Sequence, residues 1–128
     1  MIVLCDTDFL LSSLIIHETT HDQAVRLNSL IANADLQFLD LVHFEIATVM
    51  SRKYGWREAK KVLTSIGNLD ITRVSFHDFE PEIWTEFRSH TKKNIPFVDC
   101  ANLVVARKMK AKIASFDTFY PKYMRVLT

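Results

Sequence analysis

Short apolar segments alternate along this chain with longer segments of helical periodicity, and this alternation constrains the fold more than any other feature. The predicted strands cover 2–5, 36–39, 71–76, 112–116 and a short final segment at 124–127. The predicted helices cover 7–16, 21–33, 41–54, 56–67, 78–91 and 96–110. Because helices separate successive strands, we expect an α/β fold with a mainly parallel central sheet flanked by helices. Ligands in such folds bind at the carboxyl ends of the strands.

Local signals mark the ends of several elements. The run Ile2–Cys5 is wholly apolar, which is typical of a buried parallel strand. Thr20 and Gln23 have the spacing of a capping box at the start of the second helix. Gly55 separates the third and fourth helices, and Pro96 opens the last one.

The composition excludes several classes of protein. A chain of 128 residues with 48% hydrophobic residues suits a single globular domain over 1–128. Two glycines are too few for a Gly-rich phosphate loop. We find neither an apolar run of about 20 residues nor a basic signal-peptide start. Cys5 and Cys100 lack metal-binding spacing, so we expect reduced, buried thiols and a cytoplasmic protein.

The net charge of +1 conceals an asymmetry along the chain. Residues 1–50 hold seven acids and one base, whereas residues 51–128 hold fifteen bases and eight acids. One basic cluster surrounds a helix junction and consists of Arg52, Lys53, Arg57, Lys60 and Lys61. A second comprises Arg107, Lys108, Lys110 and Lys112. Such clusters can neutralise nucleic-acid phosphates, and ordinary solvated helix faces explain them equally well.

Three acids lie where a predicted element begins or ends. Asp6 ends the first strand and Asp117 follows the strand 112–116, so both should face the crevice at the carboxyl edge of the sheet. Asp99 lies in the first turn of the last helix. Capping explains Asp6 and Asp117 as well, and the helix dipole explains Asp99.

Glu45 is the acid whose position is hardest to explain by solubility. It falls within an apolar stripe formed by Val42, Ile46, Val49 and Met50 on the third helix. A carboxylate directed into packed surface is costly unless it is paired or binds a metal. The alternative is a position at the rim of the packed surface, from which the side chain reaches water.

Four carboxylates that converge on one crevice would repel one another, and divalent cations would remove this conflict. Oxygen ligands favour Mg²⁺ or Mn²⁺ over zinc. His17 and His21 have i, i+4 spacing, but a loop is expected there, and we do not favour a zinc site. A carboxylate-bound cation can activate a phosphodiester for hydrolysis.

Four segments, in order, resemble the motifs of PIN-domain ribonucleases. They are IVLCDTDFLL with Asp6, VHFEIATVM with Glu45, PFVDCANLVVA with Asp99, and IASFDTFY with Ser115 and Asp117. The resemblance covers essentially the whole chain and is nearest, by length, to the VapC toxins of toxin–antitoxin pairs. It implies a homodimeric endoribonuclease that uses Mg²⁺ or Mn²⁺ to hydrolyse RNA, and a small antitoxin protein that blocks it.

The resemblance also implies roles for individual residues. The catalytic residues and metal ligands would be Asp6, Glu45, Asp99 and Asp117. Thr7 and Ser115 would be supporting hydroxyls near the metal or the phosphate. Asp8 departs from the usual Asn or Ser and adds an acid to the site, and Phe119 stands where some members carry a further Asp.

Two other functions fit parts of the sequence. Asp6-Thr7-Asp8 also matches the opening motif of haloacid-dehalogenase-like phosphatases, in which Asp6 would be the nucleophile. The segment around Asp99 lacks the Gly-containing acidic motif of that family. A PIN-like fold can also serve as a non-catalytic scaffold that binds RNA or protein. We expect Trp56, Trp84 and Phe87 to make core or dimer contacts rather than to stack on bases.

Overall fold

The computed structural model describes residues 1–126, and its centre is a parallel sheet with strand order β3-β2-β1-β4. The strands are β1 (Ile2–Cys5), β2 (Asp35–Leu39), β3 (Thr72–Val74) and β4 (Lys112–Ala114). β1 lies between β2 and β4, with Leu4 opposite both Gln37 and Ile113. The prediction of an α/β fold with a parallel sheet is therefore confirmed.

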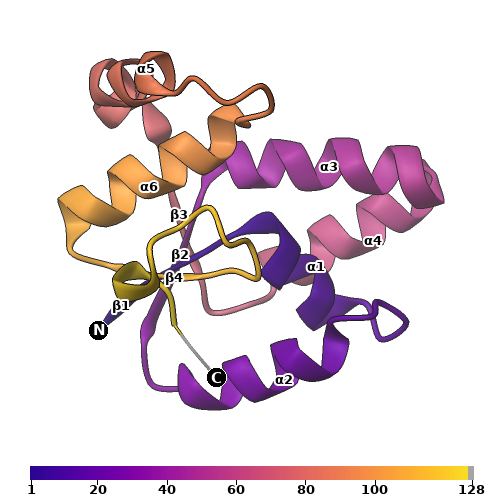
Figure 1. The fold of residues 1–128 in the computed structure, drawn as a ribbon. Coiled ribbons are helices and arrows are strands. Elements are labelled where there is room, and N and C mark those ends of the chain that lie inside the picture. The colour runs from indigo at the N-terminus through magenta and orange to yellow at the C-terminus, as the bar shows by residue number, and fades with distance from the viewer. Residues whose placement is uncertain (127–128) are drawn as a thin grey trace.

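Within residues 1–126, six α-helices connect and cover these strands (Figure 1). They are α1 (Thr7–Leu14), α2 (His21–Leu30), α3 (Asp40–Tyr54), α4 (Trp56–Gly67), α5 (Glu80–Ser89) and α6 (Phe97–Met109). Two short 3₁₀ helices, η1 (Phe76–Phe79) and η2 (Lys122–Met124), follow β3 and β4. Figure 1 shows α3 and α4 packed side by side, extending together away from the sheet.

The core is built around β1 and α6. Val3, Leu4 and Cys5 are completely buried, because strands lie on both sides of β1 and helices cover its faces. All residues from Asp99 to Ala106 on α6 are buried as well. Both cysteines are free and buried, and burial raises the pKa of Cys5 to about 12 and of Cys100 to about 11. The thiols therefore stay protonated, as expected for small core residues.

Several predicted boundaries are wrong for identifiable reasons. α2 begins at His21 as predicted, but the hydroxyl of Thr20 pairs with that of Ser12 and makes no capping bond to this helix. α2 ends at Leu30, three residues before the predicted end. β3 is shorter than predicted because Ser75 accepts from the His77 N–H and so starts η1.

The predicted final strand at 124–127 is reduced to one bridge. Met124 belongs to η2, and only Arg125 pairs with a strand residue, Ile113 of β4. Leu127 lies outside the residues that the structure describes. Within residues 1–126, no helix combines the length and apolar character that crossing a membrane requires.

The turn between α3 and α4 depends on one glycine. Gly55 has φ +91° and ψ 164°, a conformation that side-chain-bearing residues rarely adopt. This backbone allows α4 to fold back along α3 directly after Tyr54. A Cβ atom on Gly55 would meet no atom within 4 Å, so its cost would come from the backbone alone.

We predict opposite effects for alanine at the two glycines. Gly55→Ala should destabilise the protein by about 1–3 kcal/mol, because the φ of +91° is strained for alanine. Gly67→Ala, in the last turn of α4 and equally free of contacts, should stabilise it by up to about 1 kcal/mol. Urea unfolding of the two variants measures both. Equal effects would show that the Gly55 backbone does not require glycine.

Candidate active site

A cavity of about 330 Å³ opens at the carboxyl end of the sheet. Five carboxylates line it, namely Asp6, Asp8, Glu45, Asp99 and Asp117. They come from the end of β1, the first turn of α1, the helix α3, the start of α6 and the loop after β4. The structure therefore brings together all four acids that the sequence singles out, and Asp8 with them.

Asp6 lies at the bottom of this site and is only 4% exposed. Its Oδ1 accepts from the Thr7 N–H at 2.8 Å and from Asn102 Nδ2 at 3.0 Å. Its Oδ2 accepts from the hydroxyls of Tyr120 at 3.0 Å and Ser115 at 3.1 Å. Burial, followed by the charge of Asp8, nevertheless raises the pKa of Asp6 to about 7.

Tyr120 and Asn102 are site residues that the sequence analysis missed. Both are almost fully buried, and Asn102 Nδ2 also donates to the Tyr120 oxygen at 3.2 Å. The Tyr120 hydroxyl lies 3.0 Å from Asp6 and 3.4 Å from Asp99, so it links the two acids. Burial and then these carboxylates raise the pKa of Tyr120, which keeps its proton available for donation. An Asn within the apolar run of α6 was the available signal for this network.

Asp99 is buried at the first turn of α6, beside the other acids. Burial raises its pKa to about 8, and the charges of Asp6 and Asp117 add to the effect. Two neighbouring carboxyl groups are thus held partly protonated near neutral pH. A cation that replaces those protons would relieve the repulsion between the carboxylates and so stabilise the site.

Asp8 and Ser115 fasten the loop after β4 to the start of α1. Asp8 Oδ2 accepts from the Phe116 N–H at 3.1 Å, and the Ser115 hydroxyl lies 3.2 Å from both Asp8 oxygens. Ser115 also accepts from the Asp117 N–H at 3.0 Å. Burial raises the pKa of Asp8. Asp8 therefore positions the loop that carries Asp117, a role that its sequence position did not reveal.

Glu45 and Asp117 are only partly buried, so both side chains can meet solvent and a ligand. Among residues 1–126, Glu45 makes no side-chain hydrogen bond or ion pair, which fits the rim position considered above. Asp117 Oδ1 accepts from the Phe119 N–H at 2.9 Å. The Thr7 hydroxyl, expected as a supporting group, is buried and has no hydrogen-bond partner within residues 1–126.

The carboxylates share a cavity but do not yet form a coordination sphere. In the part of the chain that the structure describes, no three His, Cys, Asp or Glu side chains are already arranged to hold a metal ion. The hydrogen bonds of Asp6, Asp8 and Asp117 explain this, since their oxygens face donors of the protein. The donor set itself consists of carboxylate oxygens, the ligands that Mg²⁺ and Mn²⁺ prefer.

The geometry disfavours Asp6 as a phosphatase nucleophile. A nucleophilic carboxylate needs one oxygen free to attack phosphorus. Here both oxygens of the buried Asp6 already accept two hydrogen bonds each. The phosphatase interpretation would require this network to break.

The predicted RNA-binding cluster lies around the α3–α4 turn and lines no part of the acidic cavity. Its members Arg52, Lys53, Arg57, Lys60 and Lys61 are all exposed. Lys53 pairs with Glu18 and Lys61 with Glu58, each at 3.1 Å. Arg57 and Lys60 lie over the ring of Trp56. Trp56 is 58% exposed, so it is not a core residue, and its expected alternative, a dimer contact, stays a prediction.

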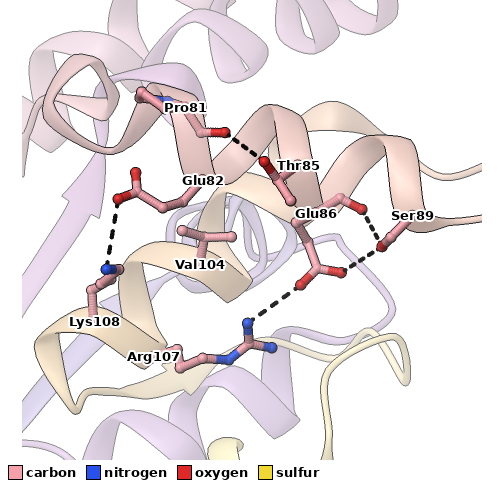
Figure 2. Close-up of a pocket in the computed structure, with 8 residues that line it drawn as sticks. All are labelled: Pro81, Glu82, Thr85, Glu86, Ser89, Val104, Arg107 and Lys108. Atoms are coloured by element: carbon pink, nitrogen blue, oxygen red, sulfur yellow. Dashed lines mark hydrogen bonds and ion pairs between the residues drawn. The ribbon is translucent and has the colours of Figure 1, made fainter.

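Two members of the second basic cluster, Arg107 and Lys108, are paired with acids across another hollow, of about 420 Å³, between α5 and α6. Arg107 pairs with Glu86 at 3.3 Å and Lys108 with Glu82 at 3.6 Å (Figure 2). Trp84 and Phe87 of α5 pack against Phe97 of α6, in agreement with the prediction of packing contacts. These bases therefore hold α5 on α6.

Comparison with known proteins agrees with the fold. A family model described as PIN domain matches residues 3–124. The structure is similar to that of Mycobacterium tuberculosis VapC20, a sarcin–ricin loop cleaving toxin, with TM-score 0.78, 21% identity and 91% of each chain covered. It is also similar to VapBC2 from Rickettsia felis bound to a DNA fragment from their promoter, with TM-score 0.66 and 17% identity. That match covers 91% of this chain and 89% of the other. No curated protein sequence matches the chain.

Removal of the Tyr120 hydroxyl tests the buried network. We predict that Tyr120→Phe costs about 2 kcal/mol of unfolding free energy at neutral pH, because Asp6 and Asp99 lose a buried donor. Tyr123→Phe is the matched control, since Tyr123 is 71% exposed and should tolerate the change. Chemical denaturation measures both variants. An unchanged Tyr120→Phe protein would mean that water replaces the hydroxyl without cost.

The raised pKa values predict how the stability of the metal-free protein depends on pH. Folded Asp6 and Asp99 bind protons more tightly than in the unfolded chain, so their contribution to stability is full below about pH 4. It should be lost as pH rises through about 7 to 8. Denaturation in EDTA at pH 5 and pH 8 measures the loss, and Asp99→Asn should make it smaller. A loss of the same size in Asp99→Asn would exclude Asp99 as its source.

Proposed function

Because this chain belongs to the PIN domain family, we propose that it is a metal-dependent endoribonuclease and the toxin of a VapBC-type toxin–antitoxin pair. The observation that supports this best is the convergence of five carboxylates on one cavity at the carboxyl end of the sheet. Protein donors contact Asp6, Asp8 and Asp117, and burial raises the pKa of Asp6 and of Asp99. A site that serves only stability has no reason to collect so much repelling charge.

The cofactor in this proposal is Mg²⁺ or Mn²⁺, held by Asp6, Glu45, Asp99 and Asp117. These residues offer oxygen ligands of the appropriate hardness, and Glu45 is not engaged elsewhere among residues 1–126. When bound, the cation supplies the charge that neutralises the carboxylates and polarises an RNA phosphodiester. Ligation requires the carboxylates to turn from their present partners, since no ready-made group of three exists in that part of the chain.

The residues of the chain contribute positioning and proton transfer. Tyr120, Asn102 and Ser115 hold the Asp6 carboxylate in one orientation from three directions. Asp8 keeps the loop of Asp117 against α1. A carboxylate oxygen of Glu45, the least engaged of the five acids, can accept the proton of the attacking water at the rim of the cavity. Hydrolysis would leave a 5′-phosphate and a 3′-hydroxyl.

The choice of RNA as substrate has two supports. The M. tuberculosis toxin of similar fold cleaves the sarcin–ricin loop. The exposed lysine and arginine side chains at the α3–α4 turn, with Arg57 and Lys60 over the Trp56 ring, offer a surface that single-stranded nucleic acid can contact. Lys53 and Lys61 would have to exchange their acidic partners for phosphates.

The partners in this proposal are a small antitoxin and a second copy of the chain. The similarity to the VapBC2 assembly supports a protein partner. An apolar hollow of about 490 Å³ at the end of α1, bounded by Met50 and Tyr54 of α3 and Val62 of α4, is a suitable surface for one. Ile16 at its edge is 80% exposed. Such exposure of a large apolar side chain favours coverage by a partner.

We predict that Asp99→Asn lowers metal-dependent RNA cleavage by at least about 100-fold, because the variant loses a buried ligand. Asp70→Asn is the matched control, since Asp70 is an exposed acid outside the cavity. The assay incubates a mixed RNA pool with Mg²⁺, Mn²⁺ or EDTA and identifies the product ends. Induced expression should arrest growth for the wild type and the control but not for Asp99→Asn.

Three outcomes would contradict parts of this proposal. Cleavage that persists in EDTA would contradict the proposed dependence on a metal ion. Absence of cleavage of any RNA, with a folded protein that still binds RNA, would instead favour the non-catalytic scaffold. Growth that continues during expression of an active nuclease would contradict the proposed role as a toxin but not the proposed nuclease activity.

A further inference from the structure

The acidic cavity does not end at Asp99 and Asp117. Both residues, with Pro96, also line a neighbouring cavity of about 590 Å³. Its other walls come from the α5–α6 connection and from the loop after β4, and they include His90, Lys92, Asn94 and Phe119. We call this space the His90–Phe119 pocket. Its volume lies within the range of roughly 300–1,000 Å³ of sites for small organic molecules.

We propose that the His90–Phe119 pocket binds the unpaired base of the RNA nucleotide that adjoins the cleaved bond, with its phosphate at Lys92. This inference rests on the proposed ribonuclease function and adds a subsite to it. The pocket is contiguous with the carboxylates, so a nucleotide in it lies next to the reacting phosphodiester.

Two rings form an aromatic wall in this pocket. The centroids of His90 and Phe119 are 5.5 Å apart and the rings are inclined by 48°. Phe119 also packs edge-on against the buried Tyr120 at 5.3 Å. Phe119 itself is only partly buried, so part of its ring remains accessible. Stacking on such a ring is a general means of binding an unpaired base.

Hydrogen bonds to the rest of the protein fix the positions of both rings. The Phe119 N–H donates to Asp117 Oδ1 at 2.9 Å, which fixes the loop on the side of the acids. His90 Nε2 lies 2.8 Å from Glu86 Oε2 on α5. Arg107 of α6 and Ser89 in turn hold Glu86, as Figure 2 shows. Because each ring has its own anchor, little ordering cost remains for a base that stacks against this wall.

Lys92 and Asn94 supply the polar part of the pocket. Both are exposed, and neither forms an ion pair or side-chain hydrogen bond with any of residues 1–126. Lys92 differs in this from Lys53 and Lys61, whose charges are paired with glutamates. Lys92 therefore has charge available for a phosphate. The Asn94 amide offers one acceptor and two donors to the edge of a base.

The first test compares ligands that differ only in the base. The ¹⁵N-labelled protein is titrated in Mg²⁺ with the four ribonucleoside 5′-monophosphates and with ribose 5-phosphate. We expect at least one nucleotide to bind at least about 5-fold more tightly than ribose 5-phosphate. Its shifts should include the amides of His90, Asn94 and Phe119. Equal affinities for all five ligands, or shifts elsewhere only, would overturn the proposal.

Variants separate stacking from charge. Phe119→Ala should weaken binding of that nucleotide by about 5- to 150-fold, the range for loss of one base–aromatic stack, and Phe119→Trp should retain it. Tyr123→Ala is the control, because Tyr123 is exposed beside the amino end of β4. Lys92→Ala should reduce the salt dependence of RNA binding by about one phosphate contact, whereas Lys93→Ala, whose residue does not line the pocket, should not.

Cleavage of a random RNA pool then tests the pocket during turnover. Phe119→Ala should relax the base preference at one position beside the cut, while Tyr123→Ala leaves the cut-site profile unchanged. An unchanged profile in Phe119→Ala would overturn the proposal. A wild-type protein that cuts no RNA would refute the nuclease function, and the nucleotide titration would still decide the pocket.

Discussion

The burial of one carboxylate, that of Asp6, organises the rest of this site. Asp6 stands at the end of β1, which lies between β2 and β4, and neighbouring segments bury it. The donors that compensate its desolvation come from the start of α1, from α6, and from Ser115 and Tyr120 after β4. Segments distant in the sequence are thereby held at one point. Because one buried carboxyl group requires several donors, it fixes which side chains gather at the carboxyl end of this parallel sheet.

The same cluster places function in conflict with stability. Asp99 and Asp6 would be ionised in an exposed setting, yet burial and mutual repulsion hold both partly protonated. Hydrophobic packing elsewhere compensates, above all along β1 and the wholly buried face of α6. Such a conflict is typical of sites kept for chemistry, since a neutral polar network would satisfy the fold at lower cost. Asp8 is a further example. It adds a carboxylate to the repulsion in the site, and it also stabilises the fold by anchoring the loop of Ser115 and Phe116.

The parallel sheet and the four principal acids could be predicted from the sequence because they depend on local order. An acid directly after an apolar run lies at the carboxyl edge wherever that strand pairs, so Asp6 and Asp117 required no further information. Tyr120 and Asn102 do not directly follow a strand, so this reasoning did not reveal them, although an Asn within the apolar run of α6 was a signal. The capping box at Thr20 failed because Ser12, eight residues earlier, competes for the same hydroxyl. Trp56 is exposed directly after Gly55, whose positive φ no pattern of hydrophobicity encodes.

Asp117 has a particular consequence because it belongs to two cavities at once. Its side chain lines the acidic cavity, and its Oδ1 holds the backbone of Phe119 beside the second one. An occupant of either space that favours one orientation of this carboxylate changes the free energy of filling the other. Linkage requires the two effects to be equal in size. The proposed cofactor and the proposed substrate would therefore strengthen or weaken each other's binding through the orientation of one carboxylate.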